Sequence, residues 1–315
     1  MSRPAHRPGE FAWLGSARQI VYPLNRLNPI WVKENVLADD LPLPSATVQV
    51  PEHHPYCEIS LNLGGSGVQH IGAESCPVEP QSVMLLGPGI PHTAQARVRP
   101  GRSITVYVLP ALFFDLGPQR DGAAILRRFT AEQPIERRVY RLNPARYRLA
   151  RTIMLKMRTT FGQQAFGREL RLRSLLAELV TSLLRWEAVD QPDGANLAEL
   201  PANWEQIQTA LRYLHEHHAE IIYMRQLAAA VRLGERQLNR LFRERLGMGC
   251  MEYLNSYRVS QAAAQLSAAH VPVTTVAFSV GFETLSHFNT TFRRVMGVSP
   301  TAYLKRKSSG QDVAA

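Results

Sequence analysis

An internal repeat of about fifty residues in the last third of the chain constrains its fold more than any other feature. Residues 227–231 return as residues 276–280, and residues 242–247 return as residues 292–297. The offset is 49 residues before the turn between these segments and 50 after it, so the second copy has one extra residue at the turn. An insertion there leaves both flanking helices intact. The repeat therefore predicts two copies of one small helical unit.

Each copy has a short apolar helix, a turn that contains glycine, and a second helix with one apolar face. This is the helix-turn-helix pattern. The apolar faces of the two second helices consist of Leu238, Leu241, Phe242 and Leu246 and of Phe288, Phe292, Val295 and Met296.

The other faces of these two helices carry side chains that can read DNA. They hold Arg236, Gln237, Asn239, Arg240 and Arg243 in the first copy, and Ser286, His287, Asn289, Thr290, Arg293 and Arg294 in the second. Arginine can form paired hydrogen bonds with guanine and asparagine with adenine, and the other polar groups can donate or accept in the major groove. One such face alone is more often a solvated helix surface. Two matching faces at a fixed period favour DNA binding.

The spacing between the copies suits two neighbouring half-sites. Residues 251–268 have the pattern of one continuous helix, which would be roughly 27 Å long. Successive major-groove faces of DNA are ~34 Å apart. The formal net charge of +10 also favours a polyanionic partner. We expect one chain to read two half-sites of double-stranded DNA.

The sequence gives no sign of a membrane or disulfide-bonded protein. Its longest apolar runs are far shorter than the roughly 20 residues that a membrane span needs, and its first residues lack the apolar segment of a signal peptide. We therefore expect no membrane partner and a cytoplasmic protein. Cys57, Cys76 and Cys250 lie far apart without a CxxC pair, which predicts neither a disulfide framework nor a cysteine zinc site.

The first two thirds of the chain change pattern along their length. Residues 47–109 alternate short apolar runs with glycine-rich turns, which predicts an antiparallel β unit. A leucine stripe between Leu172 and Leu184 has helical spacing, and it would either pack on the β unit or carry dimer contacts. Residues 189–200 contain proline, glycine and acidic residues without periodicity. We expect a first domain over residues 1–188, a linker over 189–200, a helical domain over 201–307 and a disordered tail over 308–315.

The helical part resembles the DNA-binding domain of the AraC/XylS family over residues 203–307. The resemblance rests on a C-terminal signature, Gly281, Phe282, Phe288, Phe292, Arg293, Arg294, Gly297, Ser299, Pro300 and Tyr303, and on Arg258, Val259, Ala262 and Leu266 between the copies. It implies a sequence-specific transcription regulator, an activator working with RNA polymerase, and a homodimer as the default assembly. It places the base contacts on Arg236, Asn239, Arg240, Ser286, Asn289 and Thr290. The first copy departs from the signature, because Gly249 and Cys250 stand where the second has Ser299 and Pro300. Such a glycine could loosen the entry to the intervening helix.

The β region more loosely resembles the cupin-like sensor domain that many members of this family carry. The resemblance implies an α+β multidomain chain, with an N-terminal antiparallel β-barrel and helices preceding an all-α DNA-binding domain. It also implies a small-molecule effector, for which a sugar is one candidate, bound at the barrel mouth by His53, Glu58 and His92. The alternative is that these polar groups are structural at a strand end.

A metal site is the second possibility for this region. In metal-binding cupins two histidines and a glutamate of a first motif and a histidine of a second hold one ion, and His53, His54, Glu58 and His92 could imitate them. Adjacent residues of a strand face opposite sides, so His53 and His54 could not easily bind the same ion. We therefore predict no metal and no cofactor.

Two other classes of protein are less consistent with the sequence. A metal-dependent cupin enzyme with an appended DNA-binding domain would need a complete ligand set. A DNA-alkylation repair protein would need a cysteine zinc cluster, which three scattered cysteines cannot supply. We therefore expect a regulator and not an enzyme.

Overall fold

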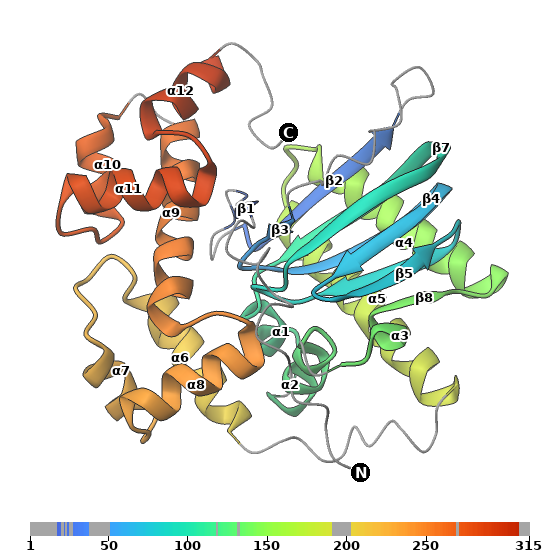
Figure 1. Ribbon diagram of the computed structural model, residues 1–315, viewed down its shortest axis with the longest axis horizontal. Helices are drawn as coiled ribbons and strands as arrows, with labels where there is room; N and C mark the ends of the chain where they lie inside the picture. The colour runs from blue at the N-terminus through green and yellow to red at the C-terminus, as the bar shows by residue number, and fades with distance from the viewer. Residues whose placement is uncertain are drawn as a thin grey trace.

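The computed structural model describes residues 18–19, 22, 24, 28–37, 51–117, 119–130, 133–190, 203–268 and 271–308. It places an antiparallel sheet with helices in the first part of the chain and seven helices, α6 to α12, in the described residues from 203 onward (Figure 1). None of the described helices is long and apolar enough to cross a membrane.

The sheet contains eight strands. They are β1 (Arg18–Gln19), β2 (Ile30–Leu37), β3 (Glu52–His53), β4 (Cys57–Ile71), β5 (Glu74–Val78), β6 (Ser82–Leu86), β7 (His92–Val108) and β8 (Val139–Arg141). The long strands β4 and β7 pair at its centre in the order β1-β3-β7-β4-β6-β8, with β2 on β7 and β5 on β4. The antiparallel prediction is correct, but the expected closed barrel is not, because β2 and β8 leave an open sheet in the described residues.

Alternation along the central strands separates an apolar face from a polar one. Ile59 pairs with Val106 and Leu61 with Ile104, and all four are fully buried. They belong to a core shared with α4 (Pro144–Phe161) and α5 (Arg168–Asp190). Between them Ser60 pairs with Thr105, and both face the opposite side of the pleat. The sheet therefore has one face packed on helices and one that holds polar groups.

The leucine stripe of α5 packs inside the chain. Leu172, Leu176 and Leu179 are almost fully buried in the core with Ile153 and Met157 of α4. Packing accounts for the stripe, and dimerisation remains a separate prediction. Three short helices, α1 (Leu112–Asp115), α2 (Gln119–Arg127) and α3 (Ile135–Arg138), connect β7 to β8.

The second domain begins with α6 (Trp204–Glu216). It continues with α7 (Met224–Ala230), α8 (Glu235–Leu246), α9 (Cys250–Ala268), α10 (Val273–Ser279), α11 (Leu285–Met296) and α12 (Pro300–Ser308). The long helix α9 runs between the α7–α8 pair and the α10–α11 pair (Figure 1). Since α5 extends to Asp190 and α12 to Ser308, the predicted linker and tail begin inside helices. Their remaining parts, residues 191–200 and 309–315, lie outside the described residues.

Candidate DNA interface and sensor cavity

The two helix-turn-helix units have the same construction. Helices α7 and α10 have 7 residues each, and α8 and α11 have 12 each. Both second helices end at a glycine in the left-handed region, Gly247 with φ 68° and Gly297 with φ 72°. The extra residue of the second copy lies in the turn, as predicted, and neither helix changes length.

The predicted recognition faces are largely open to solvent. Leu238, Phe242, Phe288 and Phe292 are fully buried. The polar candidates that are exposed are Arg236, Gln237, Arg240 and Arg243 on α8 and Ser286, His287, Asn289, Thr290, Arg293 and Arg294 on α11. Each helix thus presents a polar surface on an apolar base, as insertion into a major groove requires.

Asn239 differs from the other candidates because its carbonyl oxygen has a partner in the fold. Asn239 Oδ1 accepts a hydrogen bond of 3.1 Å from the backbone N–H of Cys250, the first residue of α9. A side chain at Gly249 would place its Cβ only 2.7 Å from that oxygen. Asn239 thus caps α9, and its amide nitrogen remains available to reach a base.

The departure from the family signature follows from this contact. In the second copy Ser299 accepts from the N–H of Ala302 and caps α12 with its own hydroxyl. In the first copy Gly249 has no side chain, and Asn239 supplies the cap from α8. The glycine therefore fits a tight contact between α8 and α9 and does not mark a loose joint.

Arg258 of α9 joins the two units. Its side chain is 6% exposed. Nε donates to the carbonyl oxygen of His218 at 2.8 Å, and Nη2 donates to that of Glu220 at 2.7 Å, both in the segment that precedes α7. Its guanidinium also lies 5.8 Å from the ring centre of Phe282, in the turn between α10 and α11. One buried cation therefore contacts the first unit and the turn of the second.

The polar face of the sheet lines a cavity of about 760 Å³. Its polar lining includes Lys33, Asn35, Glu58, Ser60, Asn62, Gln69, His92, Ser103 and Thr105. Ser60 and Thr105 share a hydrogen bond of 2.6 Å, and the Asn35 amide donates to Thr105 at 3.2 Å. Sequence reasoning missed these residues, although Ser60 lies two positions from Glu58 and so on the same face of its strand.

Three buried polar groups meet at one end of this cavity. His54 Nε2 lies 2.8 Å from Glu58 Oε2, and His92 Nε2 lies 3.6 Å from the same oxygen. The Ser60 hydroxyl donates to Glu58 Oε1 at 2.8 Å. Burial opposes ionisation of Glu58, but the hydrogen bond from His54 and the neighbouring histidine charges hold its pKa below the ordinary value. Burial lowers the pKa of His92, although Glu58 opposes this shift.

The predicted effector residues therefore have different positions. Glu58 and His92 line the cavity. His53 lies on β3 and does not line it, while His54 contacts Glu58 in its place. Burial is the main reason that the pKa of His53 falls to about 4.

The sensor domain contacts the DNA-binding domain at α9. The Tyr56 hydroxyl donates to the carbonyl oxygen of Tyr22 at 2.7 Å, and the Ser260 hydroxyl of α9 lies 2.9 Å from the same oxygen. The ring of Tyr22 packs on that of Tyr107 with centres 4.4 Å apart, and both residues line the cavity. A chain of contacts therefore leads from the cavity wall to the helix between the recognition units.

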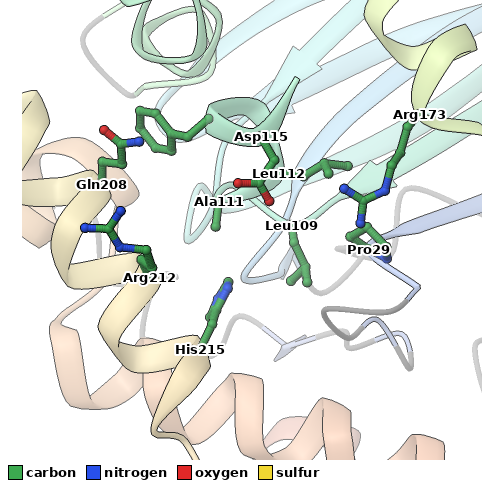
Figure 2. Close-up of a pocket in the computed structure, with 10 residues that line it drawn as sticks. Pro29, Leu109, Ala111, Leu112, Asp115, Arg173, Gln208, Arg212 and His215 are labelled. Atoms are coloured by element: carbon green, nitrogen blue, oxygen red, sulfur yellow. The ribbon is translucent and has the colours of Figure 1, made fainter. Parts of the chain in front are cut away.

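A second, smaller cavity lies between the domains, where residues of α1 and α6 face each other (Figure 2). Asp115 of α1 and Arg212 and His215 of α6 are among its lining residues. Its volume is about 80 Å³, which is too small for a sugar-sized molecule. The large cavity in the sheet domain is the better candidate for an effector.

Together, these observations describe a sheet domain that holds a large cavity and a helical domain with two helix-turn-helix units. Comparison with known protein families agrees for both parts. Residues 46–180 match the AraC-like ligand binding domain, and residues 227–306 match a helix-turn-helix domain. These matches support a regulator of the AraC family.

Curated relatives include an operon regulatory protein and a transcriptional activator. The arabinose operon regulatory protein of Escherichia coli is 30% identical over 151 residues, 45% of this chain and 49% of the relative. The HTH-type transcriptional activator RhaS of Klebsiella pneumoniae is 29% identical over 163 residues, 50% of this chain and 56% of the relative. The chain thus spans about half the length of these relatives.

Solved structures of ToxT from Vibrio cholerae share the fold over most of the chain. The apo form gives a TM-score of 0.53 at 15% identity, covering 90% of this chain and 98% of the other. The form bound to an unsaturated fatty acid gives a TM-score of 0.52 at 13% identity, covering 90% of this chain and 97% of the other. At these identities the likeness concerns the fold alone.

Proposed function

We propose that this chain is a ligand-responsive transcription regulator whose helices α8 and α11 read two half-sites of one DNA duplex. The observation that carries the proposal is the pair of equal recognition helices at the two ends of α9, each with an exposed polar face. Arg236 and Arg240 are the base readers of the first unit, with the amide of Asn239 beside them. Ser286, Asn289 and Thr290 are those of the second unit. Arg243, Arg293 and Arg294 neutralise phosphates.

The test is a footprint of the full-length protein on the DNA upstream of its own gene, followed by binding measurements on the protected duplex. Arg240→Ala should cost about 1–3 kcal/mol at one base position and relax the preference there. Arg293→Ala should weaken binding on all sequences and reduce the salt slope by about 1. Arg171→Ala, on an exposed position of α5, is a control with the same change of charge. If all three variants behave alike, binding is nonspecific attraction and the proposal is wrong.

The effector that we propose is a small polar molecule, with a sugar as the first candidate. The polar lining of the large cavity supports this choice, as does a relative named for the arabinose operon. A fatty acid, which one ToxT structure carries, would place its hydrocarbon chain against a wall that includes Asn62 and Gln69. Calorimetry with a panel of sugars and sugar acids would test the class. If only apolar acids bind, the assignment is wrong.

Coupling between effector and DNA would pass through the contact of Tyr22 with α9. Ser260→Ala removes the hydroxyl that lies on the Tyr22 carbonyl oxygen. It should reduce the effect of the effector on DNA affinity, typically 5- to 150-fold for such couplings, without changing effector-free binding. Ser256→Ala is the matched control, because that buried hydroxyl bonds to Glu252 within α9. If Ser260→Ala keeps the full effect of the effector on DNA affinity, the coupling does not pass through this contact.

Activation through RNA polymerase and homodimerisation are further parts of the proposal. The name of RhaS, a transcriptional activator, supports the first. The second is supported by Leu149 of α4 and by Phe166 and Leu170, large apolar side chains that remain exposed. In vitro transcription on the footprinted promoter and light scattering of the full chain would test these two parts. A fall in transcript when the protein is added would contradict activation. A monomer at all protein concentrations would contradict homodimerisation.

A further inference from the structure

The cluster of His54, Glu58 and His92 has an unusual arrangement of hydrogen-bonding atoms. His54 Nδ1 lies 3.1 Å from the carbonyl oxygen of Tyr56, and His92 Nδ1 lies 2.9 Å from that of Ile90. A carbonyl oxygen can only accept, so each Nδ1 must carry a proton. In a neutral imidazole the other nitrogen is then an acceptor, and in both rings that nitrogen is the Nε2 that faces Glu58 Oε2.

When both rings are neutral, three acceptor atoms therefore converge without a donor among them. The candidate ligand atoms of the three residues lie within 4.8 Å of one another, and two of the separations are 2.8 and 3.6 Å. Buried acceptors that face each other are unstable unless positive charge lies between them. One proton on His54 Nε2 would turn its 2.8 Å contact with Glu58 into an ion pair, whereas one divalent ion would use the acceptor atoms of all three residues.

The geometry favours the ion. Ligand atoms bound to one transition-metal ion at about 2.0–2.2 Å are separated by roughly 3–4 Å. The separation of 3.6 Å between His92 and Glu58 lies in this range, and that of 2.8 Å between His54 and Glu58 is slightly shorter. Histidine ligands usually donate their second ring nitrogen to a backbone carbonyl or carboxylate, as both rings do here. The Ser60 hydroxyl on Glu58 Oε1 adds an outer hydrogen bond that orients the carboxylate.

We propose that His54, Glu58 and His92 bind one divalent transition-metal ion, zinc or iron(II), at the end of the sensor cavity. Two imidazoles and one carboxylate form a ligand set that leaves coordination positions open. Glu58 and His92 line the cavity, so these positions face the space where an oxygen atom of a small molecule can bind. Since His53 and His54 cannot easily bind the same ion, His53 is left out of the ligand set. His54, Glu58 and His92 remain as three ligands. The metal site does not depend on the proposed regulatory function.

The experiment measures metal binding by the full-length chain, produced without a polyhistidine tag and stripped with a chelator. Titration with cobalt(II) should give visible d–d absorption that saturates at one ion per chain, and zinc should displace it. Elemental analysis of the unstripped protein should find about one zinc or iron per chain. If the wild-type protein binds neither cobalt nor zinc at micromolar concentration, the cluster is held by protons and the proposal is wrong.

Variants locate the ion. Glu58→Gln and His54→Gln should weaken binding by more than the 10- to 100-fold that loss of an outer hydrogen bond typically causes, and Ser60→Ala should fall within about that range. His53→Gln is the matched control, because His53 is the neighbouring histidine outside the cluster. Binding that survives Glu58→Gln or is abolished by His53→Gln would overturn the assignment. Far-UV circular dichroism and effector-free DNA binding report on folding, and the wild-type titration decides the question even if a variant does not fold.

Discussion

Arg258 offers the strongest test of how the two DNA-reading units are held together. Its guanidinium donates to two backbone carbonyl oxygens and contacts Phe282. Hydrogen bonds from a charged donor contribute about 1.5–3 kcal/mol each, and a cation over an aromatic ring adds about 0.5–1 kcal/mol. His218 is half-buried and Glu220 is exposed, so water can partly replace the lost donors. Arg258→Ala should therefore lower the free energy of unfolding of the DNA-binding domain by about 3–4 kcal/mol.

Two assays report this change in the full chain. Urea unfolding followed by far-UV circular dichroism should show the helical domain losing its structure about 1.5–2 M urea earlier, given a slope near 2 kcal/mol/M. DNA binding should fall more on a duplex with both half-sites than on one with a single half-site, because Arg258 sets the relation between the units. The stability and DNA affinity of Arg258→Lys should lie between those of the wild-type protein and those of Arg258→Ala, because one ammonium group cannot reproduce the planar fork of donors.

Arg225→Ala is the control, because Arg225 is exposed and its guanidinium lies over the ring of Tyr223, far from α9 in the sequence. A change within about 0.5 kcal/mol is expected there, as for most surface substitutions. If Arg258→Ala is equally mild and the two duplexes are affected alike, Arg258 does not join the units.

Three further predictions concern Asn239, Cys250 and Gly89. Asn239→Ala should destabilise the DNA-binding domain by about 0.5–2 kcal/mol through loss of the α9 cap, whereas Asn289→Ala should leave thermal unfolding unchanged and affect only DNA affinity. Burial raises the pKa of the Cys250 thiol to about 12, so an aromatic disulfide reagent at pH 8 should modify the part-exposed Cys76 first, and rapid modification of Cys250 in the folded protein would contradict its burial. Gly89→Ala should weaken the contact between the domains, because a Cβ there would lie 2.7 Å from the backbone of Gly247; an unchanged effector response would show that this contact does not transmit it.

Several features of the protein were predictable from local patterns in the sequence. The repeat at residues 227–303 defines two helix-turn-helix units, because the turn glycines and the apolar faces recur at helical spacing within a few residues. Alternation in the β region likewise predicts an antiparallel sheet with one buried face. The family of the chain follows from the same local residues.

Other features depend on residues that are far apart in the chain. The sheet is open because β2 pairs with β7 and β8 with β6, and β2 and β8 do not pair with each other. Strand β2 also lies outside the region in which strands were expected. The role of Asn239 depends on how α8 packs against the start of α9, which the pattern of α8 alone does not contain. His54 rather than His53 faces Glu58 and His92, and these contacts join residues of separate segments that no local pattern relates.

The sequence by itself thus determined the class of each element and the residue types on its exposed face. Periodicity is a property of neighbours three or four positions apart in a helix and two apart in a strand, and it can be read without knowing the fold. Which polar atoms meet was decided by the tertiary structure. Hydrogen bonds act over about 3 Å, and only the packing of distant segments brings such atoms that close.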